Sequence, residues 1–234
     1  MNIPLVSIII PVLNAERYLA EAIDSVLSQT YERYEIIVVG GQSTDNTEKI
    51  AKSYKQVRYI HQTGKGIWDA FNEGIDGSGG EFVAFLSADD LWAPNKLSLQ
   101  VDYLLRHPEI QYTITRVKFF LSPGYPIPPN FKPELLSGDY AIRLLESLVA
   151  RKSLFDDEIG KFNSQLTLAA DIHWFARLKD RNIPMGVISE VLIYKRIHDE
   201  NLSLSNLRGH QEILLKILKE SIKRQRCQDD KRIH

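Results

Sequence analysis

The feature that most constrains this chain is the alternation, over roughly its first hundred residues, of short apolar β-branched runs with amphipathic helical segments. Runs with the strand pattern occupy residues 5–10, 35–39, 57–60 and 82–86. Apolar residues at helical spacing fill the intervals, as in the stripe formed by Leu19, Ile23 and Val26. Strands that are apolar throughout are buried on both faces, and crossover helices between them imply parallel pairing. The sequence therefore predicts an α/β fold with a Rossmann-like, mainly parallel central sheet flanked by helices.

Three loops follow strands of this predicted sheet, at residues 11–15, 40–45 and 87–92, and all three are rich in small or polar residues. Open α/β sheets bind their ligands outside the carboxyl ends of the strands. We therefore expect the three loops to meet at a single crevice.

Composition excludes several classes of protein. The chain has 234 residues, enough for one large domain or two small ones, and 29 basic against 30 acidic residues give a formal charge of −1. That balance argues against nucleic acid as a partner, because phosphate-binding proteins carry a basic excess. The single cysteine, Cys227, excludes an intramolecular disulfide and favours a reducing compartment. No apolar run reaches the length of a membrane span, so we expect a cytoplasmic protein.

The pattern becomes less regular after residue 108. Five of the ten prolines fall within residues 122–139, which predicts a long extended segment over the sheet, and such segments are usually functional. Further on, the pattern predicts a helix over 165–180, a strand over 187–194 and a final amphipathic helix over 210–224.

Two adjacent carboxylates, Asp89 and Asp90, come just after the strand pattern of residues 82–86. A pair of this kind at a crevice is costly unless a cation or ligand neutralises it. Carboxylates are preferred ligands of Mg²⁺ or Mn²⁺, which bind through one or two of them together with substrate phosphates. The alternative is a helix N-terminal pair that interacts with the positive end of the next helix. On spacing alone the two interpretations are equally good.

Three other residues could carry chemistry. Asp171 lies in an apolar and aromatic stretch, where it is either a buried base with a raised pKa or the N-cap of the following helix. His198 follows a strand pattern and could contact a metal or a diphosphate, although a lone histidine is a weak signal. Lys65 stands between two glycines as a loop cation, for which simple solvation is the plainer interpretation.

Taken in order, these segments resemble the family-2 glycosyltransferases of the GT-A fold. The matching stretches are residues 6–14, 34–39, 43–47, 64–72, 85–92, 153–156, 160–162 and 194–198, together with Asp171. The resemblance covers about residues 4–205. It implies one GT-A domain over residues 1–205, with a nucleotide-binding part to about residue 108, an acceptor-binding part after it and a helical tail over 206–234.

The resemblance also implies a reaction and its site residues. It implies inverting transfer of a sugar from a nucleotide-sugar donor, most often a UDP-sugar, to an acceptor hydroxyl. The implied nucleotide-binding residues, besides Asp89 at the ribose, are Pro11, Val12, Leu13, Asn14, Gly41, Lys65, Gly66 and Asp69. Asp90 matches the position that binds the Mn²⁺ or Mg²⁺ ion on the diphosphate, and His198 a position that often approaches it. Asp171 matches the catalytic base.

The chain departs from the family pattern at three places. The usual acidic pair after the second strand is Gly40-Gly41, so either backbone groups or Gln42 recognise a uracil edge, or the donor is not a uridine nucleotide. Ser87 stands at the first acid of the usual acidic motif, and Ala170 at the acid that often precedes the base. These changes leave the donor open and motivate one alternative, a non-catalytic nucleotide-sugar binder of the same fold. A nucleotidyltransferase is disfavoured, because the loop after the first strand lacks a glycine-rich signature.

Two regions bear on the acceptor and on partners. Four aromatic residues near the prolines either form a platform for a glycan or lipid-linked acceptor or pack as a covering loop: Phe119, Phe120, Tyr125 and Phe131. Residues 211–226 interleave apolar and basic side chains. Such a helix suits contact with the anionic inner face of a membrane, docking on the domain, or pairing with a second copy in a homodimer.

Overall fold

The structure, a computed structural model, describes residues 3–167, 169–199, 201, 215 and 217–222. Within them, a nine-stranded sheet has the order β3-β2-β1-β4-β8-β6-β9-β5, with β7 paired to β6. The strands are β1 (Val6–Pro11), β2 (Tyr34–Gly40), β3 (Val57–His61), β4 (Phe82–Phe85), β5 (Leu91–Trp92), β6 (Tyr112–Leu121), β7 (Asp139–Ala141), β8 (Val149–Arg151) and β9 (Met185–Ile197).

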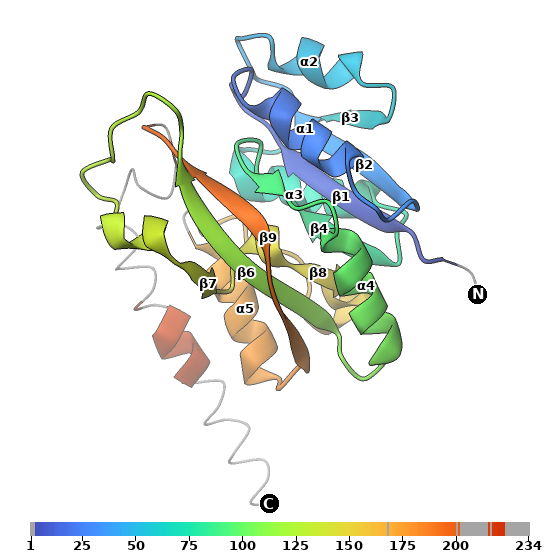
Figure 1. Cartoon of the computed structure of the whole chain (residues 1–234). Coiled ribbons are helices and arrows are strands. Elements are labelled where there is room, and N and C mark those ends of the chain that lie inside the picture. The colour runs from blue at the N-terminus through green and yellow to red at the C-terminus, as the bar shows by residue number, and fades with distance from the viewer. Residues whose placement is uncertain (1–2, 168, 200, 202–214, 216, 223–234) are drawn as a thin grey trace, which may run out of the picture.

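Helices connect and cover these strands (Figure 1). The α-helices are α1 (Leu19–Leu27), α2 (Thr47–Ser53), α3 (Gly66–Gly77), α4 (Lys96–Arg106) and α5 (Ala170–Asp180). Two 3₁₀ turns, η1 (Pro133–Ser137) and η2 (Leu145–Ser147), and a π-type turn, η3 (Leu154–Glu158), lie in the second half. The predicted mainly parallel α/β sheet flanked by helices is confirmed.

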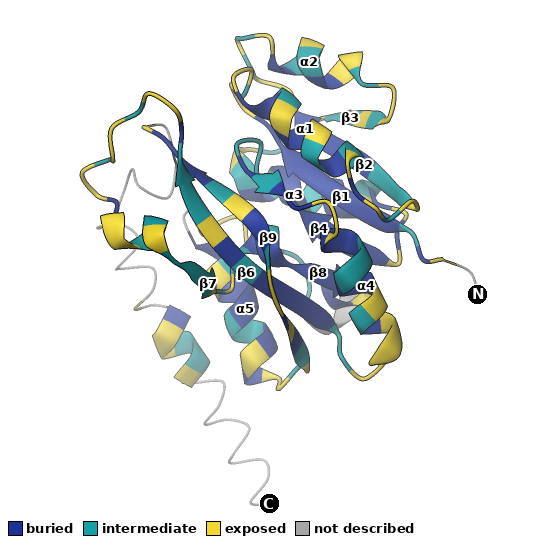
Figure 2. Ribbon diagram, in the orientation of Figure 1, coloured by how far each residue is buried: buried dark blue, intermediate teal, exposed yellow. Residues whose placement is uncertain are grey.

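The first half of the sheet is parallel and covered on both faces. β1 pairs in parallel with β2 and β4, and β2 with β3. Along β1, Ile9 packs in the cluster under α3 and α5, whereas Ile8 and Ile10 pack in the cluster under α1 and α4. All six residues of β1 are buried, and Figure 2 shows the central strands buried while the outer faces of the helices are exposed. Strands that are covered on both faces need apolar side chains at every position, which explains the continuous apolar runs in the sequence.

The second half departs from the sequence prediction. β6, β7 and β8 lie in a region for which the pattern predicted no strands, and the expected extended segment over 122–139 contains η1 and the first residue of β7. β8 runs antiparallel to both β4 and β6, and β6 pairs in parallel with β9 across a β-bulge. Each of these pairings joins residues far apart in the chain, so no local pattern could reveal them.

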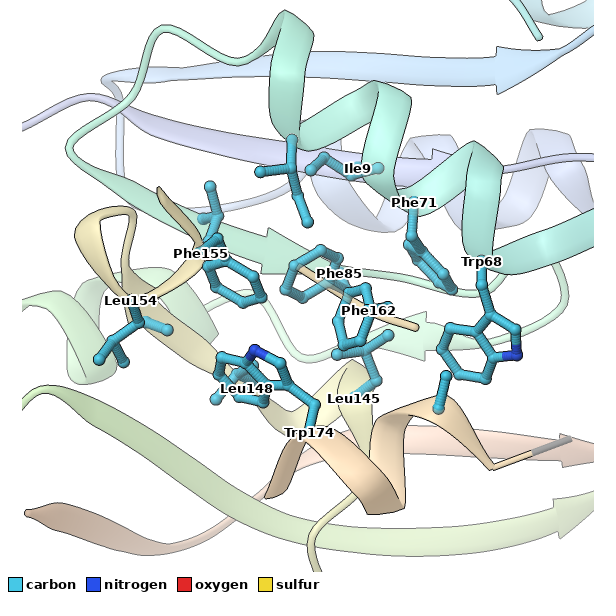
Figure 3. Close-up of a cluster of buried hydrophobic side chains, with 14 of the residues drawn as sticks. Ile9, Trp68, Phe71, Phe85, Leu145, Leu148, Leu154, Phe155, Phe162 and Trp174 are labelled. Atoms are coloured by element: carbon cyan, nitrogen blue, oxygen red, sulfur yellow. The ribbon is translucent and has the colours of Figure 1, made fainter. Parts of the chain in front are cut away.

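An aromatic core beneath the sheet fixes the start of α5 (Figure 3). The rings of Phe155 and Trp174 stack with their centroids 4.5 Å apart. From α3, the Asn72 side chain exchanges two hydrogen bonds with the backbone of Phe162, and Trp68 Nε1 donates to the Thr167 carbonyl at 3.2 Å. Helix α3 thus holds the segment that leads into α5.

The predicted C-terminal helix lies mostly outside the described residues. Residues 217–222 are helical, Ile217 is buried, and Ser221 Oγ donates to Asp180 Oδ1 of α5 at 2.5 Å. Contact of this segment with α5 fits the docking interpretation, while membrane contact and pairing with a second copy stay predictions. None of the helices in the described ranges is long and apolar enough to span a membrane.

Candidate active site

The first two predicted loops meet at the carboxyl ends of β1 and β2. The Asn14 amide donates to Ser43 Oγ at 3.0 Å, and Asn14 Oδ1 accepts the Thr44 amide at 2.8 Å. Asn14 has a φ of 49°, a left-handed conformation that asparagine tolerates better than most residues. Pro11 and Val12 are buried, whereas Leu13 is 65% exposed. Leu13 is therefore the apolar side chain of this loop that is available to a ligand.

Close packing explains the first glycine of the Gly40-Gly41 pair. A Cβ atom on Gly40 would lie 2.5 Å from Val12 Cγ2 and 2.8 Å from the Val12 carbonyl oxygen. At Gly41 the nearest atom to such a Cβ, the amide nitrogen of Gln62, would be 3.3 Å away. An acidic side chain at Gly40 would thus force the two loops apart.

Carboxylates of α3 hold the loop that contains Lys65. Asp69 Oδ2 accepts the Lys65 amide at 2.8 Å, and Glu73 Oε1 accepts the Gly64 amide at 2.7 Å. Gly66 has a φ of 79°, which favours glycine. The Lys65 residue is exposed, as the solvation interpretation expects. Asp69 thus has a visible structural role, and its contact with a nucleotide stays a prediction.

Asp90 is enclosed by cationic and amide donors from β9. Its side chain is 0% exposed; Oδ2 accepts Lys195 Nζ at 2.8 Å and Oδ1 accepts the Arg196 amide at 2.9 Å. Burial raises the pKa of Asp90 to about 8, with Lys195 opposing the shift. Each oxygen of Asp90 thus has one donor from β9, and Lys195 supplies the positive charge that faces this carboxylate.

Asp89 faces a different set of partners. Its Oδ2 lies 2.9 Å from His198 Nε2 and accepts Asn201 Nδ2 at 3.1 Å. Burial alone would raise the pKa of Asp89, but the hydrogen bond with His198 and the charge of Lys195 hold it below its usual value. The His198 ring also lies 4.9 Å from that of Tyr18, just before α1. The third predicted loop therefore contacts β9 and the residues just after it, and His198 in turn contacts the segment between β1 and α1.

Glu146 belongs to the same cluster, although the sequence did not indicate it. Its Oε1 accepts Ser87 Oγ at 2.5 Å and Lys195 Nζ at 3.1 Å. Burial opposes ionisation, yet the Lys195 charge and the Ser87 hydroxyl lower the pKa of Glu146. A lone acid in an irregular segment carries no local signal, and its partners are 59 and 49 residues away in the chain.

Asp171 lies in the first turn of α5 and is not its N-cap, because that position belongs to Ala169. Burial raises the pKa of Asp171 to about 6; the Ile172 amide opposes the shift, and the Glu146 charge adds to it. Glu146 and Lys195 both act on Asp171, so this carboxylate belongs to the electrostatic neighbourhood of the Asp89–Asp90 pair. The pKa of Asp171 is therefore closer to neutral than that of an ordinary carboxyl group.

The donor set fits a divalent cation that also binds a ligand. Among the residues described, no group of three or more His, Cys, Asp or Glu side chains is arranged to hold a metal ion alone. Asp89 Oδ2 and His198 Nε2 nevertheless face each other, and a cation held by few protein ligands typically completes its coordination with substrate phosphates. Of the two aspartates, Asp89 is the one whose side chain is partly exposed, at 25%.

Fold and site together define an α/β enzyme-like domain with a carboxylate cluster at the carboxyl ends of its parallel strands. The family model "Glycosyl transferase family 2" matches residues 7–158. The chain belongs to glycosyl transferase family 2. The resemblance stated from the sequence is thereby confirmed.

Relatives and solved structures agree with this family. An uncharacterized glycosyltransferase of Rickettsia typhi is 35% identical over 95% of this chain and 74% of its own length. One of Rickettsia felis is 38% identical over 89% of this chain, which spans only 36% of that relative. The structure of S. aureus TarS 1-349 in complex with UDP-GlcNAc superposes with a TM-score of 0.70 at 20% identity, covering 86% of this chain and 61% of that one.

A second solved structure, the mannosyltransferase PcManGT from Pyrobaculum calidifontis in complex with GDP-Man and Mn²⁺, has a TM-score of 0.67 at 20% identity. It covers 95% of this chain and 65% of its own. At these identities the two structures establish the fold, and they confirm the GT-A architecture expected from the sequence.

Proposed function

We propose that this domain transfers a sugar from a nucleotide-sugar donor to an acceptor hydroxyl with inversion at the anomeric carbon. The observation that carries the proposal is that Asp171 is partly buried and feels the charges of Glu146 and Lys195, the two residues that pair with each other beside Asp90. In this proposal Asp171 serves the acceptor hydroxyl, and the Asp89–Asp90 pair serves the diphosphate of the donor. The fold-level neighbours crystallised with UDP-GlcNAc and GDP-Man support a nucleotide-sugar donor and leave its base open.

Asp171 acts as the general base in this proposal. An acceptor hydroxyl is a weak nucleophile until a positioned group removes its proton during attack. A carboxylate with a pKa of about 6 is largely ionised at neutral pH, yet it is a stronger base than an ordinary aspartate. Attack from the side of the base, opposite the departing diphosphate, produces inversion. The acceptor itself is proposed to be a glycan or a lipid-linked molecule.

We further propose that Asp89 and His198 hold the Mn²⁺ or Mg²⁺ ion. When bound, such an ion neutralises the negative charge that develops on the leaving diphosphate. The assignment of this role to Asp90 stays a prediction beside this one; of the two side chains, Asp89 is the more exposed, at 25% against 0%. Asp90 then acts as the anchor between the acidic loop and β9.

Thermal-shift measurements with UDP and GDP, each with and without Mn²⁺, test this proposal. A ligand that binds the folded state raises the midpoint of unfolding by mass action. We expect a rise with at least one nucleotide that depends on Mn²⁺, and loss of most of it in Asp89→Asn. The matched control is Asp102→Asn, which changes an exposed carboxylate paired with Arg106 and should respond like the wild type.

Donor turnover separates the enzyme from a binding protein of the same fold. Slow Mn²⁺-dependent hydrolysis of a nucleotide sugar would support the enzyme. Tight binding with no turnover across a donor panel would favour the non-catalytic alternative, and no shift with any nucleotide would refute both.

A further inference from the structure

We propose that Glu146 is a positioning residue of the donor site, which supplies from η2 the carboxylate that this chain lacks at Ser87. The inference rests on the proposed function, because it concerns the same site. The inference extends the proposed function to Glu146, a residue outside the acidic motif. Neither the family resemblance nor the spacing of the sequence indicates this residue.

The contacts place Glu146 where an acid at position 87 would act. Ser87 follows β4 on the loop that leads to Asp89 and Asp90, and its hydroxyl reaches Glu146 Oε1 at 2.5 Å. The same oxygen accepts Lys195 Nζ at 3.1 Å. An aspartate at 87 would extend its carboxylate from the same backbone position toward the place that this oxygen holds.

Lys195 transmits the effect of Glu146 to the acidic loop. Its ammonium group lies between Glu146 Oε1 and Asp90 Oδ2, at 3.1 Å and 2.8 Å, and its side chain is 15% exposed. Two carboxylates from different elements therefore fix the position of one cation. Without the charge on Glu146, Asp90 alone would hold Lys195, and the Ser87 hydroxyl would lose its charged acceptor. The loop that carries Asp89 would then lose the charged partner that ties Ser87 to η2, and its remaining tie through Asp90 and Lys195 would be held from one side only.

A double-mutant cycle tests whether a carboxylate at position 87 can replace the one at position 146. Its four proteins are the wild type, Glu146→Gln, Ser87→Asp and the double variant. Glutamine preserves size and an acceptor oxygen but removes the charge. We expect Glu146→Gln to weaken Mn²⁺–nucleotide binding about 10- to 100-fold, the range for partners that orient metal ligands. Ser87→Asp alone should also impair binding, because it crowds two carboxylates around one lysine. The double variant should recover most of the affinity lost in Glu146→Gln.

The readouts are calorimetric binding of UDP–Mn²⁺ and GDP–Mn²⁺ and the unfolding midpoint of each protein without ligand. The matched control is Glu35→Gln, because Glu35 also accepts a serine hydroxyl, from Ser7 at 2.6 Å, and faces a cation, Arg58 at 3.3 Å. That change should leave nucleotide affinity within about twofold of the wild type, whatever it does to stability.

Two results would overturn the inference while leaving the proposed function intact: wild-type affinity in Glu146→Gln, or a double variant no better than Glu146→Gln. A wild type that binds neither nucleotide would instead count against the proposed function. In that case the unfolding midpoints still decide whether a charge at 87 replaces the charge at 146, because the lysine needs its carboxylate partners in the unliganded protein as well.

Discussion

Two clusters of one serine, one glutamate and one cation lie at opposite ends of the sheet, and they differ in burial. At the amino ends of β1, β2 and β3, Ser7 donates to Glu35, which also faces Arg58. There the side chains of Glu35 and Arg58 are 27% and 47% exposed. At the carboxyl end, the corresponding Glu146 and Lys195 are 13% and 15% exposed.

The clusters also differ in what they touch. Beyond its serine and arginine, Glu35 accepts the amide of Gly79, so its contacts are those of a structural tie between strands. The carboxyl-end cluster instead adjoins Asp90 and acts electrostatically on Asp171. A serine, a glutamate and a cation therefore stabilise the fold at one end and concentrate opposing charges at the other, where parallel α/β sheets place their ligands.

The largest expected difference between the two ends concerns Asp171. Removal of a general base typically costs 10²- to 10⁴-fold in rate, so Asp171→Asn should reduce transfer by about that factor. The same change should stabilise the fold by about 1–3 kcal/mol at pH 8, because the folded protein disfavours the charged form of this carboxyl group.

The sign of this stability effect follows from the raised pKa. The cost of ionising Asp171 is absent below its ordinary pKa of 3.8 and complete above about 6, so the variant should gain stability as pH rises through that window. Urea unfolding at pH 4 and pH 8, alongside a transfer assay, measures both quantities. Near-wild-type transfer in the variant would show that another group is the base.

The next largest effect concerns the cations. Lys195→Met leaves Asp90 and Glu146 buried together without their shared cation, and breaking a buried pair in this way costs about 3–5 kcal/mol. Arg58→Met at the amino end removes an exposed partner and should cost at most about 1 kcal/mol. Denaturant unfolding of both variants tests the contrast. Equal losses would mean that the two clusters are energetically alike.

The parallel half of the fold was predictable because its signals are local. The runs at residues 5–10 and 82–86 are apolar enough to indicate burial on both faces. Because the two strands are parallel, Asn14 and Asp89, which follow them, lie at the same end of the sheet. The antiparallel half was not predictable in this way. β8 is three residues long, and β6 pairs with β9, a strand that begins only at Met185.

The candidate site divides along the same line. Asp89, Asp90, Asp171 and His198 could be predicted as candidates from their order in the chain and its resemblance to the family. Glu146 could not be, because its importance comes from a serine and a lysine that reach it from other strands. The partner of the fully buried Asp90 is equally remote, because Lys195 lies 105 residues further along the chain.

The smallest expected effect is the pH dependence of transfer, which should depend on the carboxyl end of the sheet and not on the amino end. Because Asp171 must be ionised to accept a proton, kcat at saturating donor and acceptor should fall about tenfold per unit of pH below its pKa of about 6 and level off above it. The Glu35→Gln variant should show the same profile, since Glu35 lies at the other end of the strands. Wild-type kcat that stays flat from pH 7 to pH 5, in protein shown to remain folded by circular dichroism, would remove Asp171 from the role of base.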